Sequence, residues 1–396
     1  MTKTKLACSL LWLTFSSSIF AEHVASSTQD IDINNQAGLS LNSHDFYFRI
    51  NGRLMVDYAF WHDAAYAGVT NKNGSGSEIR RSRIYLKGKY HDWQYRFQTN
   101  FNQNGATNSN TYIKYAGFNA FDIYLGKHAE PFGLESSNSS KFNSAIERPV
   151  TGNSHFAGDR ELGVSIAGHQ KNYAYQLGVY DIASTPTDNN YAITGRVSYL
   201  PIQLNNQLLH LGLAASVRQL DEKTIFLAQD RASVHATSVK SITTGEFFAK
   251  SSRVYNIEAS YQYRQLQLSG EYQLAKFTGV NNRNNHEFTS YYLQASYFLT
   301  PDYRPYDLAS GTFLGITPNQ LSGAWELFSR YESVDFLDNQ YGSTARILTS
   351  GINYFATQYT RLSVNYTHAE IDYGRLTHNS DSIDGSALTF RVQFYW

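Results

Sequence analysis

The sequence contains very little cysteine, no net charge and no long apolar run, and each shortage excludes a class of protein. The single cysteine among the 396 residues is Cys8, near the N-terminus, so disulfide, iron–sulfur and thiol chemistry are excluded from the rest of the chain. Basic and acidic residues both number 33, which argues against a nucleic-acid partner because such binders carry a basic surplus. After Ala21, no stretch approaches the ~18 apolar residues that a membrane-spanning helix needs.

The N-terminus has the parts of an export signal. Two lysines precede an apolar and hydroxylated run that ends at Phe20, and Ala21 supplies a small residue for cleavage. We therefore expect residues 1–21 to be a cleaved signal peptide and residues 22–44 to be a short polar periplasmic segment. The remaining residues, 45–396, are expected to form the folded domain.

Tyrosine and phenylalanine are abundant, and they occur in runs of about ten residues with period-two alternation. In the first run, Phe48, Ile50 and Leu54 share one face, whereas Arg49 and Arg53 share the other. Roughly sixteen such runs occur, and short connections alternate with long ones along most of the chain. A soluble sandwich or propeller would have a polar outer face rather than a continuous apolar one. The pattern therefore predicts an all-β fold, a transmembrane antiparallel up-and-down β-barrel of about 16 strands.

The C-terminus also fits a closed barrel. Leu388, Phe390, Val392, Phe394 and Trp396 share one face of a final strand. A barrel has no sheet edge only if its last strand pairs with its first, so a chain that ends within a strand is expected. The terminal aromatic resembles the sorting signal of the barrel-assembly machinery. These features predict the Gram-negative outer membrane, with membrane lipid, lipopolysaccharide and that machinery as partners.

No catalytic constellation is present in the sequence. The segment 163–168, Gly-Val-Ser-Ile-Ala-Gly, is not a nucleophile elbow because its second glycine comes one place too late. Gly74-Ser75-Gly76 lacks the helix context and the lysine of a phosphate loop. The histidines are scattered, with no pair at ligand spacing. We therefore expect no enzyme activity, no metal and no other cofactor.

Basic residues are concentrated on the face that the alternation assigns to the barrel interior. Closure of the barrel would place nine of the twelve on one arc, opposed only by Asp57. A wall with one sign of charge focuses the electric field and attracts counter-ions, so the sequence predicts a preference for small anionic solutes. For any single residue, the alternative is that it only keeps the lumen wet. The twelve predicted pore-lining residues are Arg49, Arg53, Arg81, Arg83, Lys87, Lys89, Arg96, Arg196, Arg218, Arg330, Arg361 and Arg391. The acids on the same face are Asp57, Asp122, Glu161, Glu258, Glu271, Glu326 and Glu332.

Five stretches, in the right order, resemble the phosphate-selective porin O and P family. They are Arg80-Arg81-Ser82-Arg83, GKHAEPFGLE at 126–135, RELGV at 160–164, Arg304-Pro305-Tyr306 and GAWELFSRY at 323–331. The resemblance implies a sixteen-stranded barrel, usually a homotrimer. It also implies that the third long loop, residues 128–160, folds into the lumen as a constriction, and that the long connection 299–322 is a family feature.

The constriction loop supplies a second set of candidate site residues. Its bases are Lys141, Arg148 and Arg160, and its acids are Glu130, Glu135, Glu147 and Asp159. By this count, the sequence predicts a neutral-to-acidic constriction. The predicted function is passive diffusion of small anions, with phosphate or polyphosphate as candidate solutes. A general diffusion porin for small polar nutrients is one alternative, and a structural or adhesive barrel is another.

Overall fold

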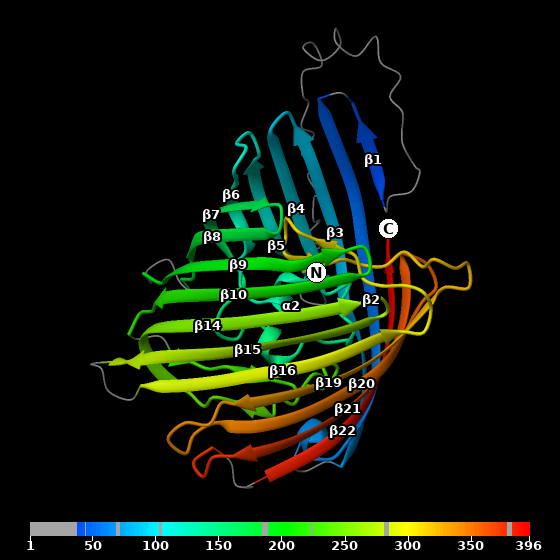
Figure 1. Ribbon diagram of the computed structural model, residues 1–396. Coiled ribbons are helices and arrows are strands. Elements are labelled where there is room, and N and C mark those ends of the chain that lie inside the picture. The colour runs from blue at the N-terminus through cyan, green and yellow to red at the C-terminus, as the bar shows by residue number, and fades with distance from the viewer. Residues whose placement is uncertain are drawn as a thin grey trace, which may run out of the picture.

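The computed structural model describes residues 38–43, 45–68, 72–102, 105–183, 189–222, 225–280, 285–377 and 382–396. One sheet in this part of the chain has 18 strands, of which two short ones, β1 and β11, are additions to a ring of 16. The ring closes because the first long strand pairs with the last, from Arg53 opposite Tyr395 to His62 opposite Ser386. The predicted antiparallel barrel of 16 strands is therefore confirmed (Figure 1). The predicted signal peptide lies outside the described residues.

Each strand of the ring pairs with its neighbours in chain order, as an up-and-down barrel requires. The ring strands are β2 (Phe46–His62), β3 (Asn73–Tyr90), β4 (Trp93–Asn102), β5 (Gly105–Tyr115), β6 (Asp122–Ala129), β7 (Arg160–Gln170), β8 (Tyr173–Asp181), β9 (Tyr191–Leu204), β10 (Gln207–Gln219), β14 (Phe247–Tyr263), β15 (Leu266–Gly279), β16 (His286–Phe298), β19 (Ala324–Asp335), β20 (Ser343–Phe355), β21 (Thr360–Tyr373) and β22 (Ser382–Tyr395). The short elements are β1 (Leu39–Asn42), β11 (Ile225–Phe226), β12 (Gln229–Asp230), β13 (Ile242–Thr243), β17 (Tyr306–Asp307), β18 (Thr312–Phe313), α1 (Ala64–Ala67), α2 (Leu134–Ser137) and η1 (Val150–Gly152).

The two faces of the strands follow the period-two alternation. On β2, Leu54 and Val56 are exposed on the outside, whereas Arg53 and Asp57 on either side of them are buried in the interior. Strand β1 lies within the segment expected to be a periplasmic tail, and it pairs with the start of β2. Among the described residues, no helix has the length and hydropathy to cross a membrane.

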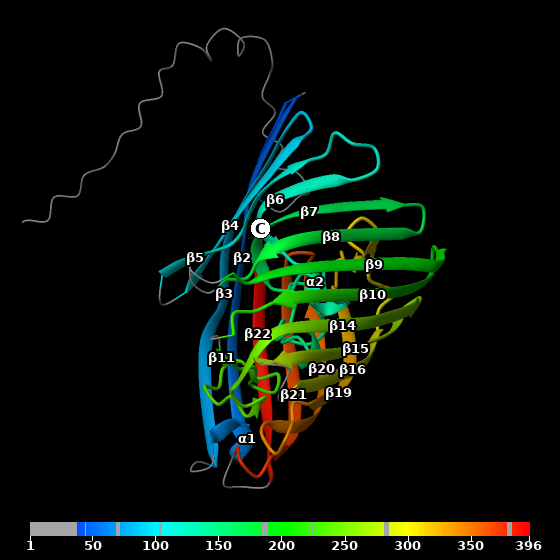
Figure 2. The ribbon, with the colours of Figure 1, turned by 90° about the vertical axis from the view of Figure 1, so that its left-hand side faces the viewer.

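Three long connections enter the ring of strands. Residues 130–159, between β6 and β7, carry α2, which lies inside the ring in both views (Figure 1, Figure 2). Residues 220–246 come from the same end of the barrel, and residues 299–323 come from the opposite end. The first two pack together near the end of the barrel that carries the long loops. There Phe156 contacts Phe226 from the second connection and Phe288 from the inner face of β16. These rings belong to the main apolar cluster of the protein.

Candidate functional site: a constriction with a basic wall

The loop 130–159 is fixed to one side of the lumen by carboxylates. Glu271 on β15 accepts the backbone N–H groups of Leu134 at 2.9 Å and Glu135 at 2.8 Å, the first two residues of α2. On β19, Glu332 accepts the N–H of Val150 at 2.8 Å. Backbone N–H groups at the start of a helix have no intrahelical partner, so a buried carboxylate satisfies them well. We call the side formed by Glu258, Glu271, Glu326 and Glu332 the anchoring wall.

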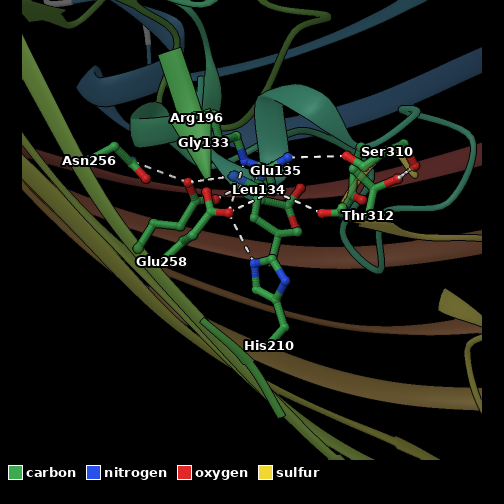
Figure 3. A network of polar contacts seen from close by, with 12 residues as sticks. Gly133, Leu134, Glu135, Arg196, His210, Asn256, Glu258, Ser310 and Thr312 are labelled. Carbon is green, nitrogen blue, oxygen red and sulfur yellow. Dashed lines mark hydrogen bonds and ion pairs between the residues drawn. The ribbon is translucent and has the colours of Figure 1, made fainter. Parts of the chain in front are cut away.

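Glu258 connects the anchoring wall to the connection from the opposite end (Figure 3). It accepts a hydrogen bond from Arg196 at 2.6 Å and contacts His210 at 3.0 Å. Arg196 also donates to the carbonyl oxygens of Ser310 at 3.2 Å and Gly311 at 2.8 Å. One guanidinium thus joins β9, β14 and the hairpin of β17 and β18.

Residues 299–323 also hold the constriction loop directly. Arg304 forms an ion pair with Glu326 at 2.8 Å and donates to the carbonyl oxygen of Phe142. Phe313 donates its N–H to the Asn138 side chain at 3.1 Å. This connection is long because it supports the loop from the opposite end of the lumen, a role that strand alternation alone did not reveal.

Three of the predicted pore-lining bases belong to this anchoring arrangement. Arg196 is paired with Glu258, Arg218 with Glu130 of the loop at 2.8 Å, and Arg330 with Glu332 at 2.8 Å. Buried ion pairs of this kind have little net charge, and removal of one partner leaves the other unpaired. These arginines therefore fix the loop and contribute little field to the lumen.

The opposite side of the lumen has a different character. Arg53 on β2, Arg81, Arg83 and Lys87 on β3 and Arg96 on β4 form what we call the basic wall. In the part of the chain that the structure describes, none of these five forms an ion pair with a carboxylate. Contacts to neutral groups include those of Arg53 with Ser140 at 3.1 Å, Arg83 with Asn100 at 3.1 Å and Arg96 with Gln98 at 2.9 Å.

Like charges lie directly opposite one another on the basic wall. Arg53 pairs across the strands with Arg83, and Lys87 pairs with Arg96. Such cross-strand pairs of like charge are destabilising. Stability alone therefore does not account for this arrangement.

The loop adds cations on the same side. Burial, together with the charges of Arg53, Lys87 and Arg96, lowers the pKa of Lys141 to about 7. Burial and the neighbouring Arg160 lower the pKa of Arg148 to about 10. Burial is the larger cause of both shifts, and the like charges nearby add to it, because cations disfavour one another's ionised forms.

The acids of the loop do not cancel these charges. Glu147 lies between Arg80 and Arg391, at 2.8 Å from each. Although its burial alone would raise the pKa of Glu147, the two guanidinium groups hold it well below the ordinary value. Glu130 is held by Arg218, and burial raises the pKa of the Glu135 carboxyl. A residue count predicted a neutral-to-acidic constriction, but two of its acids are paired with cations of the strands.

Arg80 is a site residue that strict alternation misses. The register between β2 and β3 shifts between Met55 and Val56, which lie opposite Arg81 and Ile79, so Arg80 is the extra residue of a β-bulge. Alternation would direct it to the lipid face, whereas the bulge lets it reach Glu147 in the interior. The signal in the sequence was the run Arg80-Arg81-Ser82-Arg83, whose two adjacent arginines cannot alternate.

The four remaining predicted bases, Arg391, Arg361, Arg49 and Lys89, belong to neither named wall. Arg391 is paired with both Asp57 at 2.6 Å and Glu147, although the sequence placed it in an arc with little opposing charge. Arg361 donates to the carbonyl oxygen of Asn143 at 2.6 Å and so anchors the loop. Arg49 lies over the ring of Tyr47, and Lys89, near the end of β3, is exposed.

No group of three or more potential metal ligands occurs among the described residues.

Comparison with known proteins agrees with this architecture. The family model described as phosphate-selective porin O and P matches residues 48–396. Porin O of Pseudomonas aeruginosa is 27% identical over an alignment that covers 98% of this chain and 97% of the relative.

Solved structures with the same fold are more distant in sequence. The anion-selective porin from Comamonas acidovorans is 15% identical, with a TM-score of 0.58. The match covers 89% of this chain and 100% of the porin's chain. The outer-membrane channel DcaP of Acinetobacter baumannii is 10% identical, with a TM-score of 0.59, and covers 91% and 100%. A trimer form of OmpT of Vibrio cholerae is 11% identical, with a TM-score of 0.58, and covers 89% and 100%. The match over nearly the whole barrel identifies this chain as a member of the phosphate-selective porin O and P family.

Proposed function

We propose that the protein is a passive outer-membrane channel that prefers small oxyanions such as phosphate or short polyphosphate. The observation that carries this proposal is the set of eight cations where the loop faces the basic wall: Arg53, Arg81, Arg83, Lys87, Arg96, Lys141, Arg148 and Arg160. Guanidinium groups present fixed forks of donors that match oxyanions, and lysine supplies a compact charge. In the described part of the chain, no carboxylate is paired with any of the eight.

The electric field in the lumen depends on which charges are neutralised. A narrow lumen with walls of low dielectric constant concentrates the field of these cations, which raises the local concentration of anions. The acids of the anchoring wall do not offset that field because each is engaged by a cation or by backbone N–H groups. A general diffusion porin for polar nutrients remains the second candidate, since a transverse field also orders neutral polar solutes.

The polar contacts of the lumen and the barrel fold also bear on activity, assembly and export. An enzyme is not proposed, because the polar clusters of the lumen hold the loop in place. We propose a homotrimer, supported by the trimer form of the Vibrio cholerae protein, and export by the N-terminal signal to the barrel-assembly machinery. A structural or adhesive barrel is less well supported. Side chains that only fill the lumen of such a barrel would not require like charges to face one another.

Ion selectivity in planar bilayers tests the proposal. The reversal potential across a potassium chloride gradient should report preference for chloride over potassium. Phosphate added at millimolar concentration should reduce the chloride current if it occupies the same cations. A channel that prefers potassium would overturn the anion proposal. A channel that prefers chloride but ignores phosphate would leave an anion porin without oxyanion preference.

A further inference from the structure

A hollow of about 860 Å³ lies on the outer surface of the barrel, over β14, β15, β16 and β19. These strands are adjacent in the ring, and they lie side by side in Figure 1. The floor of the hollow is made by small residues that face outward, Ala259, Gly270, Ala295 and Ser329. Larger side chains such as Tyr272 and Leu293 surround them and are exposed. The volume is in the range of ~300–1,000 Å³ that is typical of ligand sites.

Two cations lie on the same outer face, toward the end that carries the long loops. Arg253 of β14 is directly opposite Lys276 of β15. Lys276 pairs with Glu287 at 2.9 Å, whereas Arg253 forms no ion pair among the described residues. Two cations opposite each other destabilise a sheet, and Glu287 offsets only one of the two charges, so a further anionic group beside Arg253 would remove the rest of that cost.

The spacing between the cations and the hollow fits a lipid. Six residues separate Arg253 from Ala259 and Lys276 from Gly270, which is roughly 20 Å along a strand. With strands tilted by ~35–45°, this corresponds to about 15 Å of depth. One leaflet is half of a hydrocarbon core of about 30 Å, so an outer-leaflet lipid with its phosphate at the cations would extend its chains into the hollow.

We propose that this surface binds the lipid A part of lipopolysaccharide, with a phosphate at Arg253 and Lys276 and an acyl chain in the hollow. The proposal rests on the outer-membrane location and not on the anion selectivity of the lumen. The two cations lie toward the end that carries the long loops, which is the outer-leaflet side of such barrels, and lipid A is the phosphate-bearing lipid of that leaflet. The apolar hollow distinguishes this surface from a site for free phosphate.

Native mass spectrometry of the refolded, lipid-free protein tests the proposal. Lipid A, phosphatidylglycerol and phosphatidylcholine are titrated separately. The expected result is retention of lipid A by the unmodified protein, with apparent affinity reduced about tenfold in Ala295→Phe, which fills the hollow, and in Arg253→Gln/Lys276→Gln. Ala215→Phe, an outward-facing position on β10 outside the hollow, is the matched control and should retain lipid A normally.

Folding and channel function are followed in the same variants. All of them should migrate as folded barrels and conduct as the unmodified protein does, since no lumen residue is changed. Equal retention of phosphatidylglycerol, or an equal loss in the Ala215→Phe control, would overturn the lipid A site. Dissociation of an oligomer by Ala295→Phe would also overturn it, because the hollow would then belong to a subunit interface.

Discussion

The two sides of the lumen carry many charges, but they use them differently. On the anchoring wall, Glu258 and Glu332 are paired with arginines, and Glu271 binds the start of α2. On the basic wall, Arg53 and Arg83 face each other without a carboxylate partner in the described residues. The comparison shows that the number of charges on a wall does not determine its field. What matters is which charges remain after the loop has been fixed in place.

The charges of the two walls also have opposite effects on the stability of the protein. Buried carboxylates that lose a partner destabilise a protein by several kcal/mol, on the order of 3–5. The anchoring wall avoids this cost by satisfying its acids, and the result is a loop held rigidly in the lumen. The basic wall keeps unfavourable cross-strand pairs, which weaken the sheet but leave charge available for solutes.

The largest expected effect comes from removing charge from the basic wall. Arg53→Gln/Arg81→Gln/Arg83→Gln should abolish most of the preference for chloride over potassium while the pore stays open, because Gln keeps a polar, wet wall. The effect should be greatest at low salt, since the screening length is about 10 Å at 0.1 M and shorter at higher concentration. Reversal potentials at two salt concentrations provide the measurement.

Arg264→Gln/Arg346→Gln is the control for that variant, since both residues lie outside the lumen, in a turn after β14 and on the outer face of β20. Its selectivity should match that of the unmodified protein. If the control shifted the reversal potential by about two thirds as much, in proportion to the charges removed, net charge rather than the basic wall would set selectivity.

An intermediate effect is expected from the anchoring wall. Glu271→Ala removes the acceptor for the N–H groups of Leu134 and Glu135, and a buried donor left without a partner costs about 1–3 kcal/mol. The loop should become mobile, so single-channel recordings should show greater open-state noise and brief closures at nearly unchanged ion selectivity. Glu287→Gln, on the outer face of β16, should leave the noise unchanged. A quiet channel with altered selectivity in Glu271→Ala would mean that the acid contributes to the field and not to anchoring.

Sequence alternation predicted the barrel, its 16 strands and the side of the sheet on which Arg53 and Leu54 lie, because neighbouring strands fix these features locally. The alternation did not predict which charged side chains pair with one another. Arg391 and Asp57 are 334 positions apart, and Glu147 approaches Arg391 only because the loop folds inward. The β-bulge at Arg80 also breaks the period-two alternation, so its side chain reaches the interior and not the lipid face that alternation predicts. Contacts of this kind depend on closure of the ring and on loop conformation, which charge counts along the chain do not encode.

The smallest expected effect concerns pH, because it changes one cation among eight. The lowered pKa of Lys141, about 7, means that its ammonium is charged below that pH and neutral above it. Anion preference should therefore decline as pH rises from 6 to 8. Lys141→Arg keeps its charge throughout this range, since arginine stays protonated, so its anion preference should decline less than that of the unmodified channel.

The measurement uses chloride as the permeant anion, because phosphate itself titrates near neutral pH. Lys240→Arg, in the connection 220–246, serves as the control and should retain the pH dependence of the unmodified channel. Lys141 also lies 4.4 Å from the ring centre of Tyr395 and 4.9 Å from that of Phe142, contacts that an arginine can also make. The substitution therefore changes the titration while the position of the loop is kept. An unchanged pH profile in Lys141→Arg would mean that another group titrates, and that the crowding of cations at the basic wall is weaker than the structure indicates.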